Sequence, residues 1–463
     1  MRGTGAARKR TAPAGISVGS VSRQVPTTPR PPTSAGHVAR QWGEALAAVL
    51  AGFVAMAVVA ALGLWAAGAA DLPSGFVNVV AAVVVMAAGG HVELSGDAGA
   101  LAGTNAEITA MPLTVTLVGA LVAGFCFLRP LRHHAVAHTG ELLGRVVAVV
   151  VLWLAGLAAL SALAAHDFPL TLGGGDATGD LPDIFGELLD AVNPTVGFRT
   201  DLGPTLLFGL LWILGVLLIA LLVSRRTPLP PRLLRYQEPV RPVASAMLLL
   251  VLTYVVIGLG IGVVVAATQG HASETLAVLL LGLPNVSWLA LGVGIGGSWE
   301  GRVDGPFGLP MPPILDAVLR GPATSQLSTV DLSSLASYDS RAWWLLPVAA
   351  VLVLVAAFVA AVRAPARFRL WQHAVHFAIA FALTMLVVMP ITLVEARFGL
   401  SILGIGDLDS LGGEVVLRPH VWRTAGLALL WGAVAGFLGA LLATGAHRGE
   451  VDADPERPAD RTS

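Results

Sequence analysis

The chain has 463 residues, of which 55% are hydrophobic and 12% charged, with a mean hydropathy of +0.77 and a net charge of -1. A soluble domain carries about twice that share of charged residues. Because several apolar runs reach the roughly 20 residues that cross a bilayer core, the composition excludes a soluble globular domain and predicts a multi-pass membrane protein. The expected partner is the lipid bilayer, and no nucleic-acid partner is predicted.

The N-terminal segment 1–40 is basic and polar. It contains seven Lys and Arg, no acidic residue, and many Pro, Ser, Thr and Gly, so we expect a disordered cytoplasmic tail. Lys9 is the only lysine of the chain, and the Arg, Ala, Gly and Val content is typical of a high-GC, actinobacterial genome. Cys126 is the only cysteine, which excludes an intrachain disulfide.

Eight apolar runs are long enough to cross a membrane as helices. Two further apolar stretches are unusual. The stretch 76–90 is too short to span comfortably, and 275–297 is interrupted by Pro284-Asn285 and ends in a glycine-rich run. Such segments often enter and leave the membrane on one side, so we expect them to be re-entrant. The eight predicted spans are 45–68, 111–128, 142–164, 204–223, 243–267, 342–362, 374–394 and 421–444.

The distribution of charges favours this topology. With both unusual stretches re-entrant, the cytoplasmic face holds 21 of the 28 Lys and Arg, as the positive-inside rule requires. The acidic residues divide the other way, with 8 inside and 21 outside. We therefore predict an all-α polytopic membrane protein of the bacterial cell membrane, with eight transmembrane helices, two re-entrant segments and both termini in the cytoplasm. A ten-span model is the alternative.

The chain contains the same polar signature twice, 207 positions apart. This recurrence predicts two related halves, and four spans per half give them the same orientation, as a parallel pseudo-repeat. The expected parts are repeat 1 at 41–224, a basic cytoplasmic linker at 225–242, repeat 2 at 243–444 and a disordered cytoplasmic tail at 445–463. The last span of each half opens with an aromatic-Arg-Thr sequence, Phe198-Arg199-Thr200 and Trp422-Arg423-Thr424.

The duplicated signature is the candidate site. Its amides can bond irregular backbone at membrane depth, and its glycines allow the chain to turn. Its carboxylates either surround a vestibule that attracts cations or are exposed loop charges. The residues are Asn78, Gly89, Gly90, Glu93 and Asp97 in the first half, and Asn285, Gly296, Gly297, Glu300 and Asp304 in the second.

Tryptophans are expected at both membrane interfaces, where an amphipathic indole is favoured. The remaining four are expected to lie deeper and to serve packing. The interfacial set is Trp42, Trp65, Trp299, Trp343, Trp344, Trp371 and Trp422, and the packing set is Trp153, Trp212, Trp288 and Trp431.

No motif for enzymatic chemistry is present. The sequence has no Walker A loop, Gly-x-Ser-x-Gly, His-Glu-x-x-His or Cys/His zinc pattern. We predict no enzyme, no catalytic residue, no cofactor and no metal. The spans also have hardly any ionisable residue near mid-depth, which argues against an ordinary proton-coupled carrier.

The segment Leu283–Gly292, reading LPNVSWLALG, continues into Gly296–Gly301, reading GGSWEG. With the layout from about residue 40 to 445, it resembles the streptophobe family, hydrophobic membrane proteins of Streptomyces and relatives without an assigned function. The resemblance implies no substrate, cofactor or catalytic residue. The function therefore stays open between a transport- or channel-like pathway lined by the re-entrant segments and a non-transporting scaffold or envelope-assembly factor, and a homo-oligomer is compatible with either.

Overall fold

The structure is a computed structural model that describes part of the chain and divides it into two units, residues 1–40 and 41–463. Of the first unit, only 34–40 are described, as the beginning of helix α1. All further description concerns the second unit. The described residues are 34–69, 75–90, 92–97, 102–131, 139–169, 195–224, 231–268, 270, 272–303, 315, 318–319, 328–365, 368–402 and 413–452.

Within these residues, nine helices are long and apolar enough to cross a membrane, and a shorter apolar helix is α2 (Phe76–Ala87). Each predicted span is a helix, which confirms the multi-pass helical class. The nine are α1 (Ser34–Ala66), α3 (Leu113–Leu131), α4 (Thr139–Ala164), α6 (Leu202–Val223), α7 (Pro231–Thr268), α8 (Ala272–Gly294), α11 (Leu345–Arg363), α12 (Leu370–Ile391) and α13 (Val421–Asp452).

Three of these helices extend into segments that we expected to be tails or linker. α1 begins at Ser34, α7 begins at Pro231 and α13 continues to Asp452. Hydropathy marks only the apolar part of a helix. The backbone bonds of a helix need no apolar side chain, so a helix can continue into polar sequence.

In the described part of the chain, eight strands form one antiparallel sheet in the order β3-β4-β1-β2-β7-β8-β5-β6. The all-α prediction is therefore corrected: the crossing elements are helical, but segments expected to be outer loops form strands. The strands were not predicted because they lie in polar segments between the apolar runs, which we expected to form loops. They are β1 (Val92–Asp97), β2 (Ala102–Ala110), β3 (His166–Pro169), β4 (Thr195–Thr200), β5 (Trp299–Val303), β6 (Ser328–Val330), β7 (Val394–Ile402) and β8 (Gly413–Pro419).

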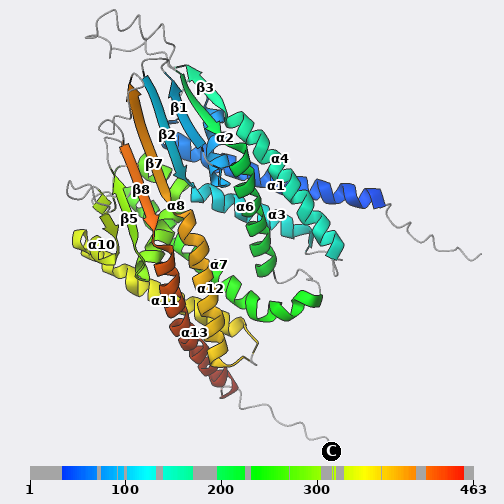
Figure 1. The fold of residues 1–463 in the computed structure, drawn as a ribbon. Helices are drawn as coiled ribbons and strands as arrows, with labels where there is room; N and C mark the ends of the chain where they lie inside the picture. The colour runs from blue at the N-terminus through cyan, green and yellow to red at the C-terminus, as the bar shows by residue number, and fades with distance from the viewer. Residues whose placement is uncertain are drawn as a thin grey trace, which may run out of the picture. The chain divides into compact units, whose positions relative to one another are not determined.

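Strands and helices follow one another with few residues between them. β4 ends at Thr200 and α6 begins at Leu202, and a single residue separates β8 from α13, so that β8 leads directly into α13 (Figure 1). β6 leads to α11 through the short helix α10 (Leu332–Tyr338) and the 3-10 turn η3 (Ser340–Trp344). A helix end that adjoins a strand is called a sheet end here. The opposite ends, where α3 meets α4, α6 meets α7 and α11 meets α12, are called far ends.

In the second half, the sheet buries one face on the helices. Along β5, Trp299 and Val303 are buried while Glu300 is partly exposed, the alternation of a strand with one covered face. Val415 on β8 and Ala396 on β7 belong to the same apolar core. The covered face of the sheet thus packs on the ends of α8, α11 and α12 that adjoin the strands.

The apolar interior forms two main clusters, one in each half. In the first half, Trp153 is stacked between Phe53 and Trp212, with ring centroids 4.2 and 4.6 Å apart. The clusters meet where Leu113 of α3 joins the second-half core and Leu281 of α8 packs on the first-half core. The contact between α3 and α8 therefore connects the two halves.

Tryptophans mark both ends of the helices. Trp344 and Trp422, at sheet ends, are 71% and 81% exposed, and Trp371 at a far end is also exposed. These positions fit the predicted interfaces. Trp299, also in the predicted interfacial set, is fully buried, with its ring against Gly292.

Candidate functional site

The glycine pair after α2 ends this helix in a Schellman turn. Gly89 has a φ of 92°, in the left-handed region that favours glycine. Its N–H donates to the Met86 carbonyl at 2.9 Å, and the Gly90 N–H donates to the Val85 carbonyl at 2.9 Å. These bonds satisfy helix-end carbonyls while the chain reverses toward β1.

The glycine pair after α8 makes the same turn. Gly296 has a φ of 89°, and its N–H donates to the Val293 carbonyl at 2.9 Å. The Gly297 N–H donates to the Gly292 carbonyl at 2.8 Å. Both halves thus use matching atoms at matching places in the signature.

The second glycine of each pair lies against the first turn of a helix. A Cβ on Gly90 would come within 3.0 Å of Thr205 Cγ2, and a Cβ on Gly297 would come within 2.8 Å of Thr424 Oγ1. Any larger residue at either place would force the helix start away. The turns are therefore closely packed against α6 and α13.

Asn285 on α8 bonds the segment that leads into α3. Its Oδ1 accepts from the Leu113 N–H at 3.2 Å, and its Nδ2 donates to the Met111 carbonyl at 3.1 Å. Asn78 on α2 is the matched amide, and its Nδ2 donates to the Leu163 carbonyl at 2.7 Å. Leu163, Met111 and Leu113 all lie at sheet ends, so both amides bond backbone at that level.

Helix α8 contacts its neighbours at their sheet ends along its length. The Thr114 hydroxyl donates to the Leu279 carbonyl at 3.0 Å and accepts from the Leu283 N–H at 3.1 Å. Toward the other end of α8, Gly294 lies against the carbonyl of Leu345, the first residue of α11. Both parts of α8 are therefore next to residues that begin a helix at the sheet.

Helix α2 has the same relation to the sheet. Asn78, in its first turn, bonds Leu163 at the end of α4. At the other end of α2, the Thr116 hydroxyl donates to the Ala87 carbonyl at 2.7 Å. Thr116 is in the first turn of α3, so α2 also begins and ends near sheet ends.

The carboxylates of the signature lie in strands. The register aligns Glu93 of β1 with Arg199 of β4, and Glu300 of β5 with Arg418 of β8. Asp97 is the last residue of β1, and Asp304 lies outside the described residues. Each of the two glutamates thus occupies a position opposite an arginine, in place of the exposed loop that we expected.

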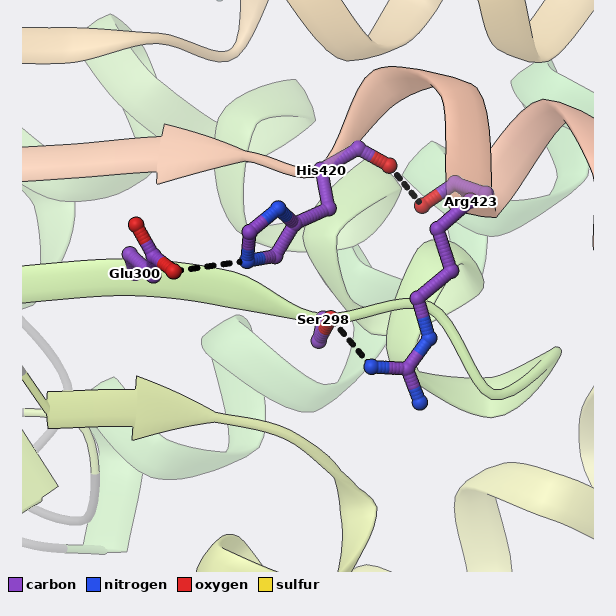
Figure 2. A network of polar contacts seen from close by, with 5 residues as sticks. Ser298, Glu300, His420 and Arg423 are labelled. Atoms are coloured by element: carbon purple, nitrogen blue, oxygen red, sulfur yellow. Dashed lines mark hydrogen bonds and ion pairs between the residues drawn. The ribbon is translucent and has the colours of Figure 1, made fainter.

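Glu300 is part of a polar network at the beginning of α13 (Figure 2). His420 Nε2 lies 3.1 Å from Glu300 Oε1, and both side chains are 42% exposed. Arg423 Nη1 donates to the Ser298 hydroxyl at 3.1 Å, and the His420 N–H donates to the Ser298 carbonyl at 3.0 Å. The segment between the glycine turn and β5 is therefore bound to α13.

Arg418 extends this network across the sheet. Its Nε donates to Glu395 on β7, and that bond, with the charges of Glu395, Glu414 and Glu300, raises the pKa of Arg418 above its ordinary value. Sequence reasoning did not single out Arg418 or His420. Only the position of His420 directly before a helix could have drawn attention to it, because the register that brings both residues to Glu300 is not visible in the sequence.

The candidate residues therefore do not form one cluster. The structure brings each glycine pair to the first turn of a helix. It brings Asn78 to the end of α4 and Asn285 to the beginning of α3, and in the strand register each glutamate lies opposite an arginine. Among the described residues, no three His, Cys, Asp or Glu side chains are grouped so that they could hold a metal ion.

These elements define the class of the protein: a multi-pass integral membrane protein whose helices are joined at one end by an antiparallel sheet. No family model, curated protein or solved structure matches the chain.

Proposed function

We propose that the chain is a non-transporting membrane scaffold for envelope assembly, built from two duplicated halves that each contain one re-entrant segment. The strand order supports the duplication. The first half contributes β3-β4-β1-β2 and the second contributes β7-β8-β5-β6. If β5 to β8 are numbered from one, the two orders are the same.

The strand register supports the same relation. Val92 aligns with Thr200 in the first half, and Trp299 aligns with Pro419 in the second. Trp299 follows Val92 by the 207 positions of the signature. The order, the register and the two glycine turns therefore agree on one set of equivalent residues.

The direction of α1 and α7 supports the re-entrant assignment. Ser245 of α7 lies near the far end of α11, because its hydroxyl accepts from Arg363 Nη1 at 3.4 Å, and nearer the end of α7 Gly262 lies against Leu279 of α8. In α1, Glu44 bonds Arg145 near the far end of α4. If α1 and α7 run to the sheet end, α2 and α8 begin there and, as they lead into β1 and β5, end there too.

The arginines support an orientation. Arg129, Arg363 and Arg369 are at far ends. By the positive-inside rule, the far ends and both termini are in the cytoplasm of the bacterial cell and the sheet is outside.

One observation carries the scaffold proposal: the sheet is continuous across the two halves. All nine residues of β2 pair with β7, and Asn285 ties α8 to the start of α3. Carriers that rock one half against the other need a mobile junction between the halves. A nine-residue strand ladder opposes that motion, so the fold is suited to a fixed framework that presents the outer face of its sheet to a partner.

Photo-crosslinking in native membranes tests this function. A photoreactive residue is placed on the sheet at Arg302 or Thr329, and as control at Leu211, an exposed apolar residue of α6. A scaffold predicts one reproducible protein adduct at both sheet positions and none at Leu211. The proposal fails if the sheet positions give no adduct in cells that express the protein at its native level.

A fixed, channel-like pathway is the second candidate. It is favoured by the two re-entrant segments, because broken helices near membrane depth often surround a transport site. Ion and solute flux into proteoliposomes tests it, with Glu93→Gln and Glu300→Gln as variants. Flux in the wild type that both variants reduce would replace the scaffold proposal, whereas no flux under any gradient would exclude the pathway.

We also propose that the chain is no enzyme, in line with the absence of a catalytic motif from its sequence, and that it belongs to the streptophobe family. Support for the family is the resemblance of Leu283–Gly292 and Gly296–Gly301. The outcomes of the crosslinking and flux experiments do not depend on either of these two proposals.

A further inference from the structure

The connection between the sheet and α13 consists of one residue, His420, whose backbone is held on both sides. Its N–H donates to the Ser298 carbonyl at 3.0 Å. Its carbonyl accepts from the Thr424 N–H at 3.0 Å and from the Thr424 hydroxyl at 3.1 Å. The imidazole points to Glu300 (Figure 2).

The charged groups around this imidazole come from β5, β7, β8 and α13. Glu300 on β5 faces it directly, and Arg418 on β8 lies opposite Glu300 in the register. Glu395 and Glu414 act on Arg418, and Arg423 on α13 bonds Ser298. Arg397 on β7 lies opposite Glu414 in the register, so guanidinium groups match these carboxylates in number. Glu300 is the carboxylate that the imidazole contacts.

The first half has no such pair. Asp201 is the equivalent of His420, because it directly precedes α6 and its carbonyl accepts from the Thr205 N–H at 3.1 Å, as His420 does from Thr424. Glu93 is the equivalent of Glu300. An aspartate beside a glutamate position cannot form an ion pair, so the imidazole–carboxylate contact is particular to the second half.

We propose that the His420–Glu300 pair is a pH-sensitive contact that holds the segment from Gly296 to Ser298 against α13, and that protonation of His420 strengthens it. Histidine ordinarily changes its charge between about pH 5 and 8. Acidification on the sheet side converts the contact into an ion pair and holds Ser298 and the first turn of α13 together. This inference goes beyond the scaffold proposal and does not depend on it.

Hydrogen–deuterium exchange of the full chain in lipid nanodiscs tests the inference. Exchange is compared at about pH 5.5 and about pH 8, after correction for intrinsic rates, in a range where carboxylates stay ionised. Peptides covering 296–303 and 420–424 should be about two- to fivefold more protected at the lower pH, the size expected of a partly exposed ion pair. His420→Gln should abolish this difference and leave the other peptides unchanged.

Two further variants keep the test decisive. Glu300→Gln should remove the same pH dependence through the other partner, and it remains informative if His420→Gln does not fold. Asp201→Asn, at the equivalent place in the first half, should leave the pH dependence intact. The inference is overturned if the wild type shows no pH difference in these peptides, or if the difference survives in His420→Gln or in Glu300→Gln.

Discussion

The side chain of Asn285 caps the beginning of α3 through the N–H of Leu113, although the two residues belong to different halves of the chain. The same amide donates to the Met111 carbonyl. Replacement of Asn285 by Ala removes both bonds and leaves a partly buried donor and acceptor without them. We expect a loss of about 1–3 kcal/mol in the free energy of unfolding.

Asn78→Ala is the matched control for this prediction. Asn78 makes one bond, at an exposed site, so its loss should cost about 1 kcal/mol or less. Thermal unfolding of both variants in the same detergent measures the difference. Equal shifts in the two variants would contradict the role assigned to Asn285.

The glycine turns predict strong sensitivity to a single methyl group. Gly297→Ala places a Cβ within 2.7 Å of the Gly292 carbonyl and 2.8 Å of Thr424 Oγ1, so we expect a loss of about 1–3 kcal/mol from overpacking. At Gly426, on α13, an added Cβ meets nothing within 4 Å. Gly426→Ala should be neutral or should stabilise the helix by up to about 1 kcal/mol.

The midpoint of thermal unfolding and the yield of folded protein check this pair of variants. Gly90→Ala should behave like Gly297→Ala, because its Cβ would meet Val85 Cγ1 at 2.5 Å. If Gly297→Ala is as stable as Gly426→Ala, the close packing of the turn against α13 is wrong.

A nearly buried ion pair joins α1 to α4. Arg145 Nη2 donates to Glu44 Oε2 at 2.6 Å, and the Arg145 side chain is 7% exposed. Glu44→Ala leaves that guanidinium without this partner, which should cost about 3–5 kcal/mol, whereas the double variant Glu44→Ala with Arg145→Met should recover most of the loss. A double-mutant cycle from unfolding in detergent measures this coupling. If the effects of the two single variants add up to the effect of the double variant, the residues are not coupled and the prediction is wrong.

Asp331 begins α10 as an N-cap, and its carboxylate accepts from the Ser334 N–H at 2.7 Å. Burial by itself would raise the pKa of this carboxyl group, but hydrogen bonds from Ser333 and Ser334 outweigh burial and lower it. A lowered pKa contributes stability that is present above the ordinary carboxyl range and is lost as the pH falls through the folded value. Asp331→Ala should therefore cost about 1 kcal/mol near neutral pH and less in acid, once the carboxyl group of Asp331 is protonated in the folded protein.

Exchange protection of the α10 backbone at both pH values checks this prediction. Asp331→Asn keeps an oxygen acceptor and should retain most of the protection at either pH. A loss in Asp331→Ala that stays the same at both pH values would contradict the assigned role of the charge.

The long helices could be predicted from sequence because about 20 apolar residues in a row have few other structures available in a bilayer. The sheet could not. β2 and β7 pair although they lie in different halves of the chain, and β6 has three residues, so no local alternation identifies them. Strand pairing between distant segments is a property of the folded chain and not of either segment.

The candidate site shows the same division. Asn285 and the pair Gly296-Gly297 were identified because an amide and a glycine pair are rare within apolar sequence. The comparison of Phe198-Arg199-Thr200 with Trp422-Arg423-Thr424 rests on sequence alone. In the register Arg199 lies opposite Glu93 and Arg418 lies opposite Glu300, so the proposed duplication pairs Arg199 with Arg418. This pairing depends on the backbone register, which is not visible in the sequence.

The central claim is that α8 returns to the side from which it enters, and cysteine labelling in whole cells tests it most directly. Cys126 is replaced, and single cysteines are placed at Ser273 before α8, at Thr329 in the sheet and at Arg369 at a far end. The account predicts that an impermeant reagent labels Ser273→Cys and Thr329→Cys alike, and Arg369→Cys only after permeabilisation. Labelling of Thr329→Cys without Ser273→Cys would mean that α8 crosses the membrane, and would contradict the account.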